Sequence, residues 1–197
     1  MSFYSDSDNI VPDQCACCLQ NVFYELMQCH SCKKKYHDHC HMPMLPEYPT
    51  SPHWSCTMCN DREFFDALKL MRSTNLGVSN GEPGRTVIEH IIMTLSSKND
   101  NIHFREYPSM KTFPKFFDTI SNPIHIAIIN NRLESNLHYI TIDQVIDDLR
   151  KVFTDSLKFY DKTHRFYGYA RNLLDLLERM VSKWIPELET KISESSS

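Results

Sequence analysis

The sequence has little glycine, no excess of positive charge and no long apolar run. Of 197 residues only four are glycine, and 25 Asp and Glu outnumber 21 Lys and Arg. This balance argues against direct nucleic-acid binding as the main activity, because phosphate backbones are bound by clustered Lys and Arg. Polar residues interrupt every apolar stretch, which excludes a membrane span. The first residues also lack the pattern of a secretory signal. We therefore expect a soluble intracellular protein with no membrane partner.

Cysteine is absent after Cys59, and all eight cysteines lie between Cys15 and Cys59. This asymmetry predicts two modules. Residues 1–60 carry 3 Lys and Arg against 6 Asp and Glu, whereas residues 61–197 carry 18 against 19. Eight cysteines permit a disulfide framework, with 105 possible pairings. Without a secretory signal, clustered Cys and His more often bind metal.

The spacing of these residues favours metal. A C-x2-C pair can place two thiolates on one ion across a tight turn, and two such pairs complete the tetrahedron that zinc prefers. The chain contains four pairs of this spacing, and hence the donors for two structural Zn²⁺ ions. Only Cys17 is left over. The pairs are Cys15 and Cys18, Cys29 and Cys32, His37 and Cys40, and Cys56 and Cys59.

The ligand order of four Cys, one His and three Cys, with Trp54 two residues before Cys56, resembles a PHD finger. A RING finger is the near alternative, but its histidine usually comes earlier in the order. The resemblance implies cross-braced ligands: Cys15, Cys18, His37 and Cys40 on one zinc, and Cys29, Cys32, Cys56 and Cys59 on the other. It also implies a mostly irregular fold over residues 12–62 with short antiparallel strands. Structural zinc keeps no open coordination position, so we expect no enzymatic activity.

PHD fingers commonly bind the N-terminal tail of histone H3 as an added strand, so the resemblance implies this partner. The edge strand would be formed by Glu25, Leu26, Met27 and Gln28. Fingers that bind the unmethylated fourth lysine of the tail have an acidic residue two positions before the first ligand. Here that residue is Asp13, whose carboxylate can accept hydrogen bonds from a free ammonium.

Methylated tails are the alternative ligand, because related fingers enclose trimethyl-lysine in an aromatic cage. The tryptophan of that cage is replaced here by Lys35, although Phe23 and Tyr24 could be remnants of the cage. We therefore expect the unmethylated tail. Two departures from the family pattern concern the same surface: residues 21–24 replace the usual Gly-Gly, and residues 49–53 contain no glycine.

The cysteine-free half has the periodicity of helices. An amphipathic helix is expected over residues 61–72, within or beside a linker spanning 63–82. The pattern predicts a four-helix bundle over residues 83–188. One expected helix starts at Pro83, one spans 123–133, one opens at the capping box Thr141-x2-Gln144, and one runs from His164 to Pro186.

The long connection within this bundle resembles that of a bromodomain. Residues 113–124 are similar to its loop with Pro, paired aromatics and a second Pro, and residues 153–160 to the end of its third helix. The resemblance implies an all-α, left-handed four-helix bundle. A PHD finger directly before it resembles the cassette of transcription intermediary factors in the tripartite-motif family, or of speckled nuclear-body proteins. It implies a nuclear protein in transcriptional regulation, with other chromatin proteins as partners. We expect a fragment or a truncated relative, since no tripartite half is present.

The acetyl-lysine pocket departs from the family pattern. The asparagine that donates to the acetyl carbonyl aligns with Tyr160, or with Asp161 if the alignment is shifted by one residue. The tyrosine that holds the bridging water aligns with Phe116. We therefore expect a degenerate or repurposed bromodomain with an aromatic pocket. Its expected residues are Phe104, Phe116, Phe159, Tyr160 and Phe166.

Three hypotheses on function follow. The first is a non-enzymatic chromatin reader that binds the H3 tail through the finger. The second is a SUMO E3 ligase cassette, because a related PHD finger recruits a conjugating enzyme for its neighbouring bromodomain. The third is a protein-interaction scaffold that binds no histone, which the altered pocket and the missing Gly-Gly would favour.

Overall fold

The computed structural model describes residues 13–21, 25–45, 47–49, 51–71, 77–106, 110–111 and 113–188. Phe23 and Tyr24, the suggested cage remnants, lie outside the described residues. Within the described residues no helix is long and apolar enough to cross a membrane.

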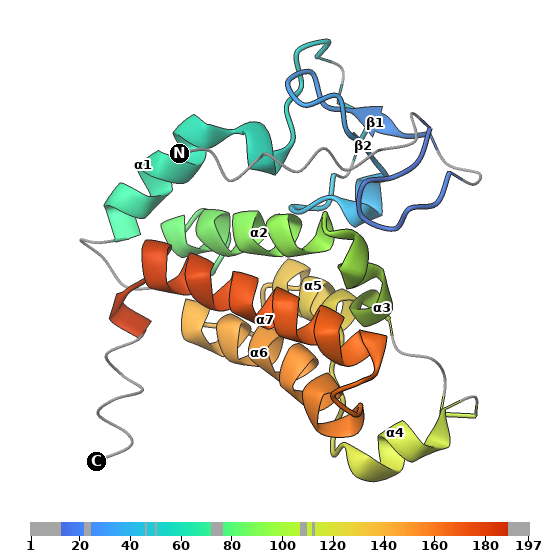
Figure 1. The fold of residues 1–197 in the computed structure, drawn as a ribbon. Coiled ribbons are helices and arrows are strands. Elements are labelled where there is room, and N and C mark those ends of the chain that lie inside the picture. Colours follow the sequence, from blue (N-terminus) through green and yellow to red (C-terminus); the bar gives the residue numbers. More distant parts are fainter. Residues whose placement is uncertain are drawn as a thin grey trace.

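A small finger with little regular structure forms the first module, which stands above the helical bundle in Figure 1. Its two strands pair antiparallel, with Met27 opposite Tyr36 and Gln28 opposite Lys35. The expected short antiparallel strands are thereby confirmed. The elements of the finger are β1 (Met27–Gln28), β2 (Lys35–Tyr36) and the 3-10 turns η1 (Asp38–Cys40) and η2 (Thr57–Cys59).

Four long helices form the second module, as the sequence predicts. Two short helices and a 3-10 turn, which the sequence analysis did not anticipate, lie in the connection between the first two long helices. The long helices are α2 (Pro83–Ser96), α5 (Ile126–Glu134), α6 (Ile142–Phe159) and α7 (Arg165–Trp184). The short elements are η3 (Asn99–Asn101), α3 (Ile102–Arg105) and α4 (Pro114–Thr119).

The helix ends follow local chemistry. The expected capping box opens α6, where the Gln144 side-chain oxygen accepts hydrogen bonds from the backbone N–H groups of Ile140 and Thr141. The helix expected from Pro123 instead begins at Ile126. Asn122 precedes proline and has a φ of 52°, and His125 is extended, so the chain enters α5 only after this turn.

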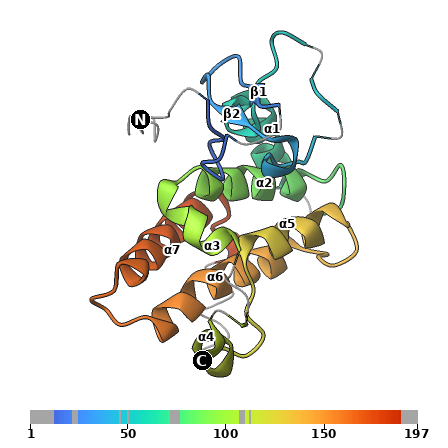
Figure 2. The same cartoon turned by 90° about the vertical axis from the view of Figure 1, so that its right-hand side faces the viewer.

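A further helix, α1 (Asp61–Met71), follows the finger and confirms the expected helix over residues 61–72. It does not lie free as a linker: its side chains Phe64, Ala67 and Met71 are buried. The ring of Phe64 stacks on His90 of α2 with a centroid distance of 4.1 Å and meets Trp184 of α7 edge-on at 4.8 Å. Figures 1 and 2 both show the finger and α1 lying over α2, with α6 and α7 beneath.

The two modules share one continuous apolar core that runs from the zinc finger through α1 into the bundle. The second half of the expected linker is also attached to the bundle. Gly77 forms an antiparallel bridge with Thr141, and the backbone N–H of Val78 donates to Ile140 at 3.2 Å. The structure thus gives a packed pair of modules.

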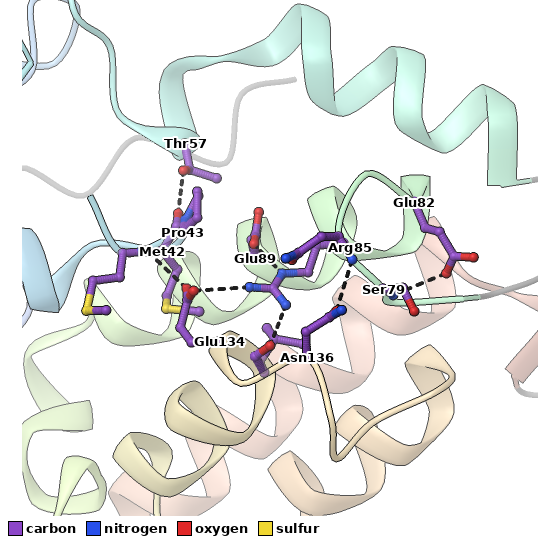
Figure 3. Close-up of polar contacts among 12 residues, drawn as sticks. Met42, Pro43, Thr57, Ser79, Glu82, Arg85, Glu89, Glu134 and Asn136 are labelled. Carbon is purple, nitrogen blue, oxygen red and sulfur yellow. Dashed lines mark hydrogen bonds and ion pairs between the residues drawn. The ribbon is translucent and has the colours of Figure 1, made fainter. Parts of the chain in front are cut away.

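A buried arginine connects the modules through polar contacts (Figure 3). Arg85 of α2 donates to the Glu89 carboxylate at 2.5 Å, and its guanidinium lies 3.4 Å from the Glu134 carboxylate at the end of α5. Glu134 in turn accepts the backbone N–H of Met44 in the finger at 3.0 Å. Arg85 also donates to the carbonyl of Leu133. One cation thereby holds α2, α5 and a finger loop together.

Candidate functional site: two zinc clusters and an aromatic cavity

The first cluster contains Cys15, Cys18, His37 and Cys40, and the four donor atoms all lie within 4.8 Å of one another. The Nδ1 atom of His37 is 3.4 Å from the Cys18 sulfur and 3.6 Å from the Cys40 sulfur. A tetrahedral zinc with ordinary bond lengths separates a sulfur and a nitrogen ligand by about 3.6 Å. These residues therefore fit zinc, with His37 binding through Nδ1.

The second cluster contains Cys29, Cys32, Cys56 and Cys59, again with all donor atoms within 4.8 Å. The sulfurs of Cys32 and Cys56 are 3.8 Å apart, which is about the separation of two thiolates on one tetrahedral zinc. All eight cysteines are free of disulfides. Two zinc sites with the cross-braced pairing implied by the PHD resemblance are confirmed, and the disulfide alternative is excluded.

Zinc supplies the folding energy of such a small module and no open position for chemistry, since each ion would have four protein ligands. The pKa values of the ligand thiols differ from one another. Hydrogen bonds lower the pKa of Cys15, and the one with Cys17 has the largest effect. A hydrogen bond with Cys56 lowers the pKa of Cys32 to about 5. Burial raises the pKa of Cys59 to about 12. Because zinc must displace the remaining thiol protons, acid weakens its binding.

Aromatic packing and backbone hydrogen bonds hold the ligands in place. Trp54 packs on Tyr36 and His41 beside the ligands. His41 is buried; its Nδ1–H donates to the carbonyl of Pro43, and its Nε2 accepts the backbone N–H of Thr57. Cys17, the cysteine left over, is buried beside Cys15.

An arginine of the bundle reaches the first zinc cluster. Arg105, the last residue of α3, places its Nη2 atom 2.9 Å from the sulfur of Cys40. Its neighbour Phe104 turns the other way, into the bundle, where its ring meets Phe153 edge-on. A guanidinium beside a zinc-bound thiolate offsets part of its negative charge and orients it. This contact, 65 residues apart in sequence, has no signature in the sequence.

Replacing Arg105 with methionine is expected to speed zinc loss from one of the two sites. Outer-shell partners of metal ligands are worth about 10–100-fold in metal affinity. We therefore predict that, when a chromophoric chelator competes for the metal, the site with Cys40 releases its zinc faster than in the unaltered chain. The other site should release its zinc at an unchanged rate. Lys69→Met removes an exposed cation of α1 and is the matched control. Equal release rates in Arg105→Met and the control would show that the contact does not support the site.

Residues of α3 and its neighbours also line a cavity of about 330 Å³ in the bundle. Its lining residues include Phe116 of α4, Ser156 of α6 and Phe166 of α7. Four of the five expected pocket residues line it: Phe104, Phe116, Tyr160 and Phe166. Phe159 is not part of the lining and packs behind it, with its ring 5.1 Å from Phe116 and 5.0 Å from Tyr160.

The structure also places Asp161, the alternative alignment for the family's asparagine. Its carboxylate is exposed and accepts hydrogen bonds from the backbone N–H and hydroxyl of Thr163 at 2.9 and 2.8 Å. Tyr160, not Asp161, therefore lines the cavity. Glu106 and Phe113 also line it, although the sequence did not predict them. Both flank the loop connection, where no periodicity indicates which side chains turn inward.

The residues expected to bind a histone tail lie on or beside the two-stranded sheet of the finger. Met27 of β1 is buried, whereas Glu25 and Gln28 are exposed and Leu26 is half-buried. Asp13 lies beside β2, the strand paired with β1, and its side chain is 81% exposed. The structure thus brings Asp13 and the segment 25–28 onto the same small sheet.

Comparisons with known proteins agree with this architecture. Residues 88–172 match the family model described as Bromodomain. Tripartite motif-containing protein 66 of Mus musculus is 28% identical over 160 residues, which cover 75% of this chain and 11% of the relative. E3 ubiquitin-protein ligase TRIM33 of Homo sapiens is 26% identical over 166 residues, covering 80% and 14%. Bromodomain-containing factor 2 of Saccharomyces cerevisiae is 31% identical over 96 residues, covering 47% and 15%.

The chain spans only 11% to 15% of the length of these relatives. The match to the tripartite-motif proteins nevertheless extends over 75% to 80% of this chain, whereas the bromodomain model covers residues 88–172. Residues 88–172 of the bundle thus match the bromodomain family, the cysteine clusters before it fit a PHD finger, and the chain is homologous to tripartite-motif proteins.

Proposed function

We propose that the chain is a non-enzymatic chromatin-reading module of a nuclear protein in transcriptional regulation. Its finger would bind the N-terminal tail of histone H3 with the fourth lysine unmethylated. The bromodomain and the homology to tripartite-motif proteins support a role on chromatin. Four protein ligands for each zinc support a binding role over a catalytic one.

The observation that carries the proposal is the open edge of β1. Cys29 donates its backbone N–H to Lys34 at 2.9 Å, so the adjacent pair of Gln28 and Lys35 directs its backbone groups away from each other. The carbonyl of Lys35 accordingly accepts from Ala16 on the outer side of β2. Gln28 therefore presents its N–H and C=O outward, and no strand among the described residues pairs with that edge. A peptide strand can add there.

Charge supports a basic partner on this surface. Residues 1–60 have a formal charge of −3, and seven thiolates on two Zn²⁺ ions bring it to about −6. The histone tail is rich in Lys and Arg, so this field favours its association. Lys35 stands where a methyl-lysine cage would have its tryptophan, which supports the unmethylated tail.

Lys35 also holds the carboxylate that would receive the histone lysine. Its Nζ atom lies 2.8 Å from the Asp13 carboxylate. An incoming ammonium must share or replace this contact. Such an exposed ion pair contributes about 0.2–1 kcal/mol, so the competition lowers affinity by a few-fold at most.

This arrangement predicts opposite effects of two substitutions on calorimetric binding of an unmodified H3 tail peptide. Asp13→Asn should weaken binding about tenfold, because a charge-assisted hydrogen bond is lost. Lys35→Ala should strengthen it a few-fold, because the carboxylate is released. Asp66→Asn on α1 serves as control. If Asp13→Asn leaves the affinity for the peptide unchanged, this binding mode is refuted and the scaffold hypothesis is favoured. If the unaltered chain does not bind the peptide, the histone proposal is refuted.

We further propose that the bromodomain does not bind acetyl-lysine in the usual way. Phe116 and Tyr160 stand in the cavity where the family has a tyrosine and an asparagine, so both polar groups that orient the acetyl amide are altered. Loss of a buried hydrogen bond costs about 1–3 kcal/mol, a large part of the weak affinity of such a ligand.

A further inference from the structure

Among the described residues, five Phe and Tyr rings line the cavity of the bundle, and these are set at different angles. Tyr160 is nearly perpendicular to Phe166, with centroids 5.3 Å apart, and more nearly parallel to Phe113 at 6.5 Å. Phe116 lies 6.1 Å from Phe113. A compact group among rings this close together lies within about 6 Å of several centroids, which is the range of a cation–π contact.

In the described part of the lining, the charged polar group is an acceptor, and the donors are the Tyr160 hydroxyl and the His103 ring. Glu106 lines the cavity with a carboxylate. The Ser156 hydroxyl donates to the carbonyl of Val152 at 3.2 Å, so only its lone pairs face a ligand. An acetyl amide needs a donor for its carbonyl oxygen, whereas a cation is stabilised by a carboxylate and by ring faces.

Within the part of the chain that the structure describes, neither lysine nor arginine lines the cavity. Its histidine, His103, has its pKa lowered by burial and by the nearby Arg165, which favours the neutral ring. Arg165 itself is exposed and outside the lining, and its guanidinium carbon lies 5.0 Å from the centre of the Phe166 ring. One ring of the set thus already contacts a cation from the chain.

We propose that this cavity binds a methylated ammonium group, as carried by a trimethyl-lysine side chain, through the rings of Phe113, Tyr160 and Phe166 and the Glu106 carboxylate. The inference is independent of histone-tail binding by the finger. It gives the altered pocket a ligand of different chemistry from the neutral amide: a cation with no hydrogen bond to donate, held by ring faces and charge.

The test titrates the full zinc-loaded, ¹⁵N-labelled chain with three capped amino acids and follows amide shifts by NMR. The three are trimethyl-lysine, acetyl-lysine and the neutral isostere of trimethyl-lysine in which carbon replaces the charged nitrogen. Shifts around Phe104, Glu106 and Tyr160 report the cavity, and shifts around Gln28 report the finger. We expect trimethyl-lysine to bind in the cavity about tenfold more tightly than its neutral isostere.

Three variants separate charge recognition from simple apolar filling. Phe113→Leu keeps an apolar wall without a ring, and should remove the preference for the cation while leaving the neutral isostere bound. Glu106→Gln should weaken only the cation, by a few-fold, and Asp118→Asn on exposed α4 is its matched control. Tyr160→Asn, which restores the amide of the family, should invert the preference toward acetyl-lysine. Thermal unfolding of each variant checks that the bundle is intact.

Equal affinity for the cation and its neutral isostere would overturn the proposal, and so would tighter binding of acetyl-lysine by the unaltered chain. Shifts confined to the finger, or no shifts at all, would also overturn it. None of these results bears on the unmodified tail at the β1 edge, so failure of this inference is distinguishable from failure of the histone proposal.

Discussion

Removing zinc with a chelator is expected to unfold residues 13–60 and to destabilise the bundle that remains. Structural zinc in small fingers contributes about 10–16 kcal/mol of apparent binding free energy, as much as the entire stability of a typical domain. The finger buries mainly its own ligands and a few side chains such as Met27, Tyr36 and Met58. Without the ions, no metal–ligand bonds hold its thiols and His37 close together.

The bundle should respond because the finger covers part of it. Met42 donates its backbone N–H to the sulfur of Met93 in α2, and Ser97 donates to the sulfur of Met58. Met93 is fully buried in the intact chain and would face water once the finger unfolds. We therefore expect the α-helical circular dichroism to be largely retained but the melting temperature of the bundle to fall.

The two tryptophans allow the modules to be followed separately. Trp54 lies in the zinc core and Trp184 at the end of α7 beside Phe64. In Trp184→Phe, emission comes from Trp54 alone, and it should shift to the red when chelator is added and return with excess zinc. The same chelator saturated with zinc is the control. Unchanged Trp54 emission after both ions have been removed would contradict the assignment of zinc as the source of the finger's folding energy.

Replacing Arg85 with methionine should cost about 3–5 kcal/mol of folding free energy. Its side chain is only 7% exposed, and the substitution leaves Glu89, 10% exposed, without its cation. Breaking a buried ion pair by removing one partner is far more damaging than its net contribution implies, because an uncompensated charge stays in the interior. Glu134 and the carbonyl of Leu133 lose a partner as well.

Urea unfolding in excess zinc measures this effect, and two comparisons make it specific. Arg150→Met breaks a bidentate pair with Glu178 nearer the surface, and should cost about 1 kcal/mol or less. The double variant Arg85→Met, Glu89→Leu removes both charges and should recover part of the loss. A single substitution at Arg85 that is no worse than Arg150→Met would contradict the buried network.

The penalty at Arg85 should also depend on pH. Burial raises the pKa of Glu89 above its usual range even with Arg85 beside it, and removal of Arg85 removes a stabilising charge, so the pKa must rise further. A carboxyl with a raised folded-state pKa stabilises the fold below that pKa and loses this contribution as pH rises through it. The difference between Arg85→Met and the unaltered chain should therefore be smaller at pH 5 than at pH 7.5.

The zinc ligands were predictable because their signal is local. Each pair, such as Cys15 and Cys18, lies on one turn, and the order of the pairs indicates which family pairing to expect. Helix positions were predictable for a similar reason: the apolar period and the capping box at Thr141 are short-range features. The predicted start of α5 at Pro123 was wrong because the turn at Asn122 lies before the helix, where the apolar helical period gives no information.

The contacts between modules could not be predicted in this way. Arg85 and Glu89 resemble an ordinary surface pair at helical spacing, and only packing against α5 and the finger buries them. Arg105 resembles a solvated residue of a short helix until Cys40 approaches it. In the cavity, Phe104, Phe116 and Tyr160 followed from the resemblance, but Phe113 and Glu106 depend on how the connection between α2 and α5 folds back.

The most direct test of the account is the amide of Gln28 on β1. If the finger binds the H3 tail as an added strand, an unmodified tail peptide should shift the Gln28 amide resonance and slow its hydrogen exchange, because that N–H gains a backbone acceptor. The amide of Met27, already directed at β2, should keep its exchange rate. A bound peptide that leaves Gln28 exchange unchanged would contradict the strand-addition mechanism and, with it, the proposed function.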